Sequence, residues 1–416
     1  MTLDIPIVLA SIYIFVTLNF FGWGMLGDQR FIFFSLVISF LYIVLGLFQQ
    51  SKGKTILWSK IILFCTFAAV AVFGVTGNVM MLRHRTSVEG FINDSGLQTE
   101  IAGRFLLLGK NPYKESYEQT DLAKAKYIDE AGNTTNPALY HNAYPPFLLI
   151  LSAVGFRVFS QVFSWFDIRV ISLIFYTGLL LLGFVKFGIS ERLIFFLALV
   201  GINPLFMSHM IQGSNDIVVL TLLLWSLFLL ERKQFFLASL LLGLSITTKQ
   251  TAWFAFPFYM FYVWKTATQR QFLHFFISLS SITLLLFLPF ILWDSRALFE
   301  NLILYVNGSL PNSYPIHNFG LGMFLVKIGL IPTIYTYYPF WIWQVVIGGL
   351  VFVIWLKVRK KQCTAADVLS GFSVLLAVSW IFNRFMNFSY LAVLATVVAI
   401  ASLWADKNNL DHSRSN

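Results

Sequence analysis

Long apolar segments, separated by short polar loops, are the feature that most limits how this chain can fold. Twelve of them occur, at residues 5–26, 31–49, 56–80, 168–186, 193–209, 216–231, 235–249, 251–264, 272–292, 338–357, 365–382 and 388–404. The hydrocarbon core of a bilayer is about 30 Å thick, and a helix of roughly 20 residues crosses it. Several of these segments are shorter, so we expect some helices to be tilted or broken. The pattern predicts an all-α polytopic membrane protein with about 12 transmembrane helices.

Composition agrees with this class of protein and excludes others. Of the 416 residues, 58% are hydrophobic and only 12% are charged. A soluble fold of this length could not bury so much apolar surface, whereas helices in a bilayer can expose it to lipid. A net charge of +10 would suggest nucleic acid in a soluble chain, but most Lys and Arg residues lie in short loops between apolar segments. We therefore expect the lipid bilayer as a partner, and no nucleic acid.

The positions of the basic loops predict the orientation in the membrane. Two further apolar segments, residues 144–163 and 319–335, could cross the bilayer or lie in its interface. If neither crosses, the loops that contain Lys186 and Lys265 fall on the same side as both termini. If one of them crosses, the basic loop at residues 357–361 moves outside, against the positive-inside rule. The sequence thus predicts twelve crossings with both termini cytoplasmic.

This topology divides the chain into five regions. They are N-terminal transmembrane helices (1–80), an external loop with amphipathic helices (81–167), central transmembrane helices (168–292), a late external loop (293–337), and C-terminal transmembrane helices with a cytoplasmic tail (338–416). The chain shows no repeat of fixed period, and none of the regions has the composition of a second soluble domain.

Polar residues from segments far apart in the sequence fall at the predicted outer boundary of the membrane. They are Asp94, Tyr144, Gln212, Asn215, Asp216, Lys249, Gln250, His317 and Arg384. Charged groups at a membrane edge are costly and usually mark a functional site. Because the topology brings all these segments to one face, we predict a catalytic or binding cavity there. No D-x-D motif or His/Cys cluster accompanies them, so we expect no metal or other cofactor.

Residues 94–108 have the pattern of an amphipathic helix in the first external loop. Leu97, Ile101 and Phe105 recur at helical spacing, and Gly109 is a typical residue just beyond a helix end. Such a helix can lie in the membrane interface. Asp94, at its start, could be only a helix cap, or it could be a catalytic carboxylate held over the cavity.

The other candidates also have simple structural explanations. Lys249 and Arg384 could extend to lipid headgroups. Asp216 could cap the helix that follows it, and His317 is a lone histidine of the kind that is more often structural than catalytic. Glu100 lies on the opposite face of the amphipathic helix, so we rank it well below as a catalytic base.

Four motifs together resemble a known superfamily. They are "GKNPY" (109–113), "YPP" (144–146), "INPLFMSHMIQGSNDIVV" (202–219) and "GLSITTKQTAWFAFP" (243–257). In this order they resemble the GT-C superfamily of integral-membrane glycosyltransferases, most closely the polyprenyl-phosphate-sugar-dependent mannosyltransferases of glycosyltransferase family 87. The resemblance covers roughly residues 85 to 264, and it continues loosely through "RFMNFSY" (384–390). The chain departs from the family in having two apolar spans before the one that leads into the acidic loop.

The resemblance implies transfer of one sugar from a polyprenyl-phosphate carrier to a hydroxyl of a glycan or lipid acceptor, with inversion. Such a displacement needs one base, for which Asp94 is the candidate. The leaving phosphate needs cations, for which Lys249 and Arg384 are the candidates. The remaining polar residues would contact the sugar or the carrier. The resemblance also implies a bacterial plasma membrane with the site facing outside.

Other functions remain open from the sequence. A polysaccharide ligase or polymerase would use a carrier diphosphate and a large late external loop, of which residues 293–337 are a modest version. A transporter or flippase would place its site at the membrane midplane between paired halves, which the chain does not show. A membrane assembly partner without chemistry is a third possibility. Polar residues that share an outer cavity would favour transfer chemistry over transport.

Overall fold

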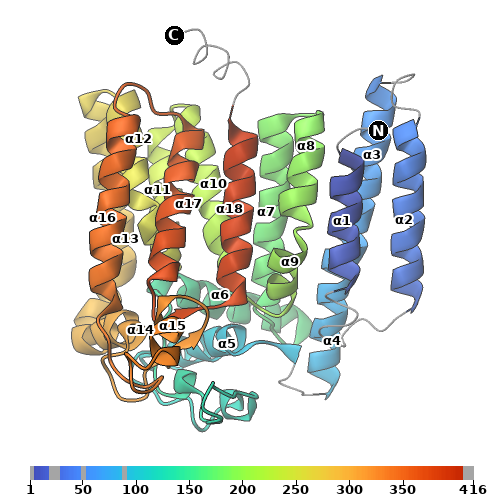
Figure 1. Ribbon diagram of the computed structural model, residues 1–416. Coiled ribbons are helices and arrows are strands. Elements are labelled where there is room, and N and C mark those ends of the chain that lie inside the picture. Colours follow the sequence, from blue (N-terminus) through green and yellow to red (C-terminus); the bar gives the residue numbers. More distant parts are fainter. Residues whose placement is uncertain (1–3, 18–28, 48–52, 87–90, 406–416) are drawn as a thin grey trace.

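The computed structural model describes residues 4–17, 29–47, 53–86 and 91–405, which form a bundle of roughly parallel helices (Figure 1). Its first elements are α1 (Asp4–Thr17), α2 (Gln29–Leu47), α3 (Gly53–Ala68), η2 (Ala69–Gly74), α4 (Val75–Thr86), α5 (Asp94–Leu107), η4 (Asp121–Lys124), η5 (Pro137–Leu139), α6 (Pro146–Phe163), α7 (Arg169–Phe187), α8 (Glu191–Phe196), η6 (Leu197–Gly201) and α9 (Pro204–Ile211). The others are α10 (Asp216–Glu231), α11 (Phe235–Ile246), η7 (Gln250–Phe254), α12 (Phe256–Thr266), α13 (Gln269–Phe299), η8 (Glu300–Leu304), α14 (Tyr305–Asn307), β1 (His317–Asn318), α15 (Leu321–Lys327), α16 (Phe340–Val358), α17 (Ala365–Ile381), β2 (Phe385–Met386) and α18 (Phe388–Trp404).

The structure supports an all-α membrane protein but does not confirm twelve crossings. Each of the twelve predicted segments is mostly helical where it is described, but some residues, such as 202–203, 247–249 and 338–339, are not helical; residues 18–26 and 48–49 lie outside the described residues. By length and composition, five helices of the described chain could span a membrane, or up to six if α8 to α9, bent by 49°, counts as one broken span. Several others, such as α11 with 12 residues, are shorter than a full crossing requires.

The two segments that the sequence left undecided between crossing and lying in the interface, residues 144–163 and 319–335, differ in the length of the helix that they contain. Residues 146–163 form α6, whose 18 residues are long and apolar enough to cross. Residues 319–335 contain only the seven-residue α15, which is too short for a crossing. That α6 does not cross therefore stays a prediction. In Figure 1, α5 and α6 lie across the lower end of the bundle, whereas the long helices run from this end to the other.

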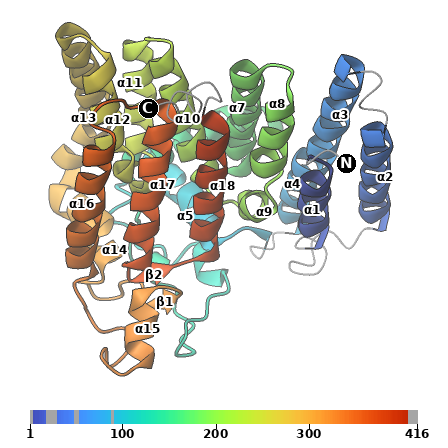
Figure 2. The ribbon, with the colours of Figure 1, turned by 45° about the horizontal axis from the view of Figure 1, so that its top comes forward.

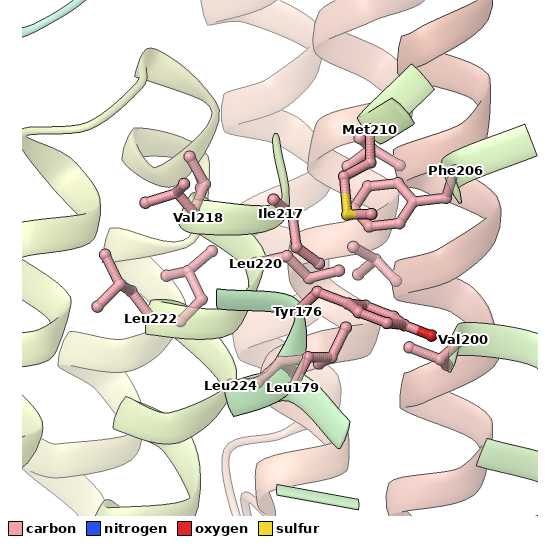
Figure 3. Close-up of a cluster of buried hydrophobic side chains, with 14 of the residues drawn as sticks. Tyr176, Leu179, Val200, Phe206, Met210, Ile217, Val218, Leu220, Leu222 and Leu224 are labelled. Atoms are coloured by element: carbon pink, nitrogen blue, oxygen red, sulfur yellow. The ribbon is translucent and has the colours of Figure 1, made fainter. Parts of the chain in front are cut away.

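Helix α10 forms the centre of the apolar core. It is apolar on all sides, with a buried stretch that runs from Asp216 through Leu224, and a helix of this kind is surrounded by others. Figure 3 shows its side chains, among them Leu220, packed against Tyr176 of α7 and Met210 of α9. The Tyr176 hydroxyl donates a hydrogen bond to the Gly201 carbonyl (2.7 Å), so the one polar atom of that ring is satisfied.

Helices α1 to α4 stand to one side of the other helices in both ribbon views (Figures 1 and 2). A buried ion pair joins three of them: Lys60 Nζ of α3 lies 2.7 Å from Asp4 Oδ2 of α1. The hydroxyl of Tyr42, on α2, donates to the same carboxylate oxygen (2.8 Å). A charge inside an apolar bundle is stable only when it is paired in this way.

The loops at the α5 end are tied together by close backbone contacts. Strand β1 pairs in parallel with β2, with His317 opposite Phe385, so the late loop is joined to the turn before α18. Helix α5 packs on α6 at Gly103, where a Cβ atom would lie 2.6 Å from Ser152 Oγ. Only glycine allows the two helices to approach this closely. The α5 end is therefore an ordered assembly of segments from distant parts of the chain.

Candidate active site

A cavity of about 880 Å³ lies where these segments meet. Seven of the nine predicted site residues line it: Asp94, Tyr144, Gln212, Asp216, Lys249, Gln250 and Arg384. They come from α5, the turn before α6, the α9–α10 turn, the start of η7 and the turn before α18. The other two predicted residues, Asn215 and His317, are not among the lining residues. Polar residues chosen from one predicted face of the membrane thus surround one space at one end of the bundle.

The start of α5 is held against the α9–α10 turn. Asn93 is the helix cap, because its Oδ1 accepts a hydrogen bond from the Gly96 amide (2.8 Å). Its own backbone N–H donates to the Gln212 carbonyl (2.7 Å). The interpretation of Asp94 as the helix cap is therefore wrong; its carboxylate accepts only the Ser95 amide from the first turn (2.8 Å).

The predicted end of α5 is confirmed. Gly109 has a φ of +69°, and its N–H donates to the Leu106 carbonyl (3.1 Å). The N–H of Lys110 donates to the Phe105 carbonyl (2.9 Å). These two bonds are the Schellman motif, which satisfies the last carbonyls of a helix and favours glycine at the left-handed position.

Asp94 has little to neutralise its charge. Its second oxygen accepts a hydrogen bond from Asn136 Nδ2 (3.2 Å), and no cation pairs with it among the described residues. Burial, followed by the Asp94 charge, raises the pKa of Tyr144 and of Tyr314. Both phenols line the cavity and are neutral hydrogen-bond donors at physiological pH. Asp94 is thus an unpaired carboxylate at the wall of a cavity that also offers neutral hydroxyl groups.

Glu100, on the same helix, has a structural role. It is 1% exposed, and its carboxylate accepts two hydrogen bonds from the Arg83 guanidinium (2.7 and 2.9 Å) and one from the Ile168 amide (2.8 Å). Arg83 also pairs with Asp167 (2.8 Å), which Arg169 holds by two side-chain bonds (2.6 and 2.8 Å). The low rank of Glu100 as a base is consistent with this placement.

This four-residue cluster positions α5. Burial alone would raise the pKa of Asp167, but the Arg169 guanidinium, with help from Arg83, outweighs it and lowers that pKa to about 2. Arg169 also donates to the carbonyls of Phe91 (2.8 Å) and Ile211 (3.1 Å), just before α5 and at the end of α9. The cluster therefore joins α4, α5, α7 and α9 beside the start of the helix that carries Asp94.

Lys249, just before η7, pairs with Asp216, the first residue of α10. Its Nζ lies 2.7 Å from Asp216 Oδ1, and the Lys249 side chain remains 14% exposed. The other Asp216 oxygen accepts a hydrogen bond from Ser214 Oγ (2.7 Å). An ammonium group has three donors, and this pair uses one of them. Lys249 is thus a partly neutralised cation that still borders the cavity.

Arg384 is buried, and it binds backbone carbonyls instead of a carboxylate. Its guanidinium donates to Tyr314 (2.5 Å), Ile334 (3.1 Å) and Thr336 (3.1 Å), and it has no carboxylate partner among the described residues. Desolvation lowers its pKa to about 10, so the group remains a cation at neutral pH. Gly308, with a φ of +88°, packs against it, and a Cβ there would clash with the guanidinium. Arg384 therefore holds the late loop together and brings an unneutralised charge to the cavity wall.

The remaining candidates lie as follows. Gln250 donates through Nε2 to the carbonyls of Ala143 (2.7 Å) and Leu302 (3.3 Å), and its amide oxygen has no hydrogen-bond partner among the described residues. Asn215 is 2% exposed, and neither side-chain polar atom has a hydrogen-bond partner in the described structure. His317 Nδ1 lies 3.3 Å from a carboxylate oxygen of Glu130.

Sequence reasoning missed other residues of the cavity wall. His209 lies three positions before Gln212, within a motif that was recognised, and its spacing could have singled it out. The lining tyrosines Tyr305 and Tyr390 carry no comparable signal, because the chain has 16 tyrosines. The same is true of Asn136, which donates to Asp94 but does not itself line the cavity. Among the residues that the structure describes, no three or more His, Cys, Asp or Glu side chains are grouped as metal ligands.

Comparison with known proteins adds one family match. Residues 101–265 match the MptA_B family model, described as Alpha-(1->6)-mannopyranosyltransferase, N-terminal domain. The matched segment includes Tyr144, Gln212, Asp216 and Lys249 and begins shortly after Asp94. No curated protein and no solved structure matches the chain. The match confirms the resemblance to GT-C mannosyltransferases and supports glycosyltransferase activity.

Proposed function

We propose that this protein transfers a mannosyl or similar hexosyl group from a polyprenyl-phosphate carrier to a hydroxyl of a glycan- or lipid-linked acceptor, with inversion. The family match supports sugar transfer in general. The choice of donor, acceptor and stereochemistry goes further, and it rests on the residues around the cavity.

The observation that carries the proposal is the unpaired Asp94 carboxylate at the wall of the 880 Å³ cavity. In an inverting displacement, the acceptor oxygen attacks the anomeric carbon from the face opposite the phosphate. The bond from that carbon to the phosphate oxygen breaks, and the phosphate leaves with the electron pair. Asp94 takes the proton of the attacking hydroxyl. A carboxylate already neutralised by an arginine, as Glu100 is, would be a poorer base.

The donor phosphate would bind between Lys249 and Arg384. Negative charge grows on this group as it leaves, and fixed cations stabilise that charge. Arg384 has five N–H donors, of which backbone carbonyls take three, and its positive charge lacks a carboxylate partner within the described chain. Lys249 would contribute as a point charge, weakened by Asp216.

The other polar residues would bind the sugar and the carrier. Gln212, Tyr144 and the amide oxygen of Gln250 line the same cavity. Asn215, buried without a hydrogen-bond partner, would gain one from a substrate hydroxyl after a small shift. His317, beside Glu130, would lie at the edge of this region.

We place the cavity on the outer face of a bacterial plasma membrane. Helix α1 begins and α18 ends at the end of the bundle opposite α5, so the two termini would share one side (Figure 1). The basic loops of the sequence make that side cytoplasmic. A cavity at one end of the bundle also favours transfer over transport, because a transporter site lies near the midplane.

The test is Asp94→Asn in purified full-length protein. The amide keeps nearly the same shape and can still accept from Ser95, so donor binding should be unchanged, while transfer should fall by roughly 10²–10⁴-fold because no base remains. The assay would use labelled polyprenyl-phosphate mannose, the corresponding diphosphate and a nucleotide-sugar donor. Asp121→Asn, outside the cavity, is the matched control. An active Asp94→Asn enzyme would refute the role of Asp94. Transfer only from the diphosphate would favour a ligase or polymerase.

A further inference from the structure

A second cavity, of about 290 Å³, lies between α4, α5 and the α6–α7 loop. Its lining includes Arg83, His84, Arg104, Phe156 and Trp165. Two carboxylates also line it, and both are paired: Asp121 with Lys124, and Asp167 with Arg83 and Arg169. Arg104 is ten residues beyond Asp94 on α5, which is about 15 Å along a helix. This cavity shares no lining residue with the candidate active site, and the proposed transfer reaction does not use it.

Two basic side chains of this second cavity are free to bind an anion. Arg104 is exposed and has no ion-pair partner among the described residues; its guanidinium lies over the Phe156 ring, 5.0 Å from the centroid. His84 stacks on Trp165 (5.0 Å, 20°), and within the described chain its ring nitrogens have no hydrogen-bond partner. Arg83, by contrast, is already bound to Glu100 and Asp167. The cavity therefore pairs two unused donors with two aromatic rings.

An exposed apolar surface adjoins these donors. Phe163, at the end of α6, is 56% exposed, and its ring centroid lies 6.5 Å from that of Trp165, the residue on which His84 stacks. Trp165, two residues further on, lines the cavity and is of the type enriched where a membrane meets water. Basic donors beside partly exposed aromatic rings match an anionic headgroup joined to acyl chains.

We propose that this cavity binds the phosphate of an anionic membrane phospholipid. Arg104 and His84 would donate hydrogen bonds to the phosphate oxygens, and the acyl chains would cover the exposed ring of Phe163 at the end of α6. The volume of 290 Å³ admits a phosphate with part of its glycerol, since a water molecule takes about 30 Å³ of liquid volume. This site is separate from the one proposed for the donor carrier, and the inference does not depend on the proposed function.

The test is lipid retention by the full chain in neutral detergent, measured by native mass spectrometry. We expect the wild type to retain phosphatidylglycerol but not a diacylglycerol of the same chain lengths. Arg104→Gln and His84→Gln should each weaken retention at least tenfold, because each removes a charge-assisted or direct contact with the phosphate. Arg157→Gln is the matched control, since this exposed arginine of α6 does not line the cavity. Arg104→Lys should keep part of the retention.

A second measurement locates the lipid. Brominated phosphatidylglycerol should quench the fluorescence of Trp165, seen as the difference between wild type and Trp165→Phe, and Arg104→Gln should abolish that difference. Unchanged retention in Arg104→Gln and His84→Gln would overturn the proposal. So would an equal loss in Arg157→Gln, which would indicate general surface attraction. Saturable binding of inorganic phosphate without retention of phosphatidylglycerol would show a free-anion site and overturn the assignment to a lipid.

Discussion

Replacing Asp167 by Asn tests whether the buried charge cluster holds the end of the bundle that carries α5. Asp167 is 2% exposed and accepts hydrogen bonds from the guanidinium of Arg169 (2.6 and 2.8 Å) and from that of Arg83 (2.8 Å). The cluster contains two arginines and two carboxylates, so its charges cancel when both carboxylates are ionised; burial and the Asp167 charge raise the pKa of Glu100. Asn keeps the size of the side chain but leaves one positive charge buried without compensation.

The expected loss of unfolding free energy can be calculated in two ways. The pKa of Asp167 falls from 3.8 to about 2, and each pKa unit corresponds to about 1.4 kcal/mol, so the charged form stabilises the fold by about 2 to 3 kcal/mol. Removing one partner of a buried ion pair typically costs about 3 to 5 kcal/mol. We therefore expect Asp167→Asn to lower the free energy of unfolding by about 2 to 5 kcal/mol.

Asp121→Asn is the matched control, because it is the same substitution in an exposed pair. Asp121 lies 2.8 Å from Lys124, and its side chain is 50% exposed. Exposed pairs contribute at most about 1 kcal/mol. Equilibrium unfolding in mixed detergent micelles would compare both variants with wild type. A loss in Asp167→Asn no greater than in Asp121→Asn would refute the reasoning.

The pH dependence gives an independent check. A carboxyl group whose pKa is lowered in the folded state stabilises the fold above its unfolded pKa of about 3.8, and this contribution is lost as the pH falls through about 2. The Asp167 contribution to the difference in stability between wild type and Asp167→Asn should therefore shrink as the pH falls below about 4. A difference that grows below this pH would contradict the assigned ionisation of Asp167.

Three further predictions follow from local geometry. Gly308→Ala should cost about 1 to 3 kcal/mol, because its Cβ would clash with Arg384, whereas Gly109→Ala, also at positive φ but with open space around it, should cost only about 1 kcal/mol in thermal or chemical unfolding. Asn93→Ala should remove the cap of α5 and cost about 1 kcal/mol, with a parallel fall in transfer activity if the start of α5 frays. Cysteine placed at Arg359 should react with membrane-impermeant reagents only from the cytoplasmic side; labelling from outside would overturn the proposed topology.

The sequence by itself determined the helical elements. The predicted segments 216–231 and 388–404 coincide with α10 and α18, because an apolar run of this length has few alternatives to a helix in lipid. Gly109 marked the end of α5 because the left-handed turn there needs a residue without a Cβ. These features depend on interactions within a few residues, which are visible in one stretch of sequence.

Motif order and the basic loops also pointed to one end of the bundle. From this, the sequence predicted that Asp94, Lys249 and Arg384 would share a region, and all three line one cavity. Their individual roles could not be predicted in the same way. Asp94 and Glu100 are both acidic residues of α5, yet Glu100 is bound by Arg83, from α4, while Asp94 has no cation partner in the part of the chain that the structure describes.

Only the tertiary structure decided which charges are neutralised. Lys249 meets Asp216, 33 positions away, and Arg384 meets the carbonyls of Ile334 and Thr336 instead of any carboxylate. An ion pair in a bundle depends on a few ångströms of separation between helices, and that separation is set by side-chain packing along their whole length. No pattern within a single segment carries this information. The physical difference between a structural carboxylate and a free one is therefore a property of the assembled fold.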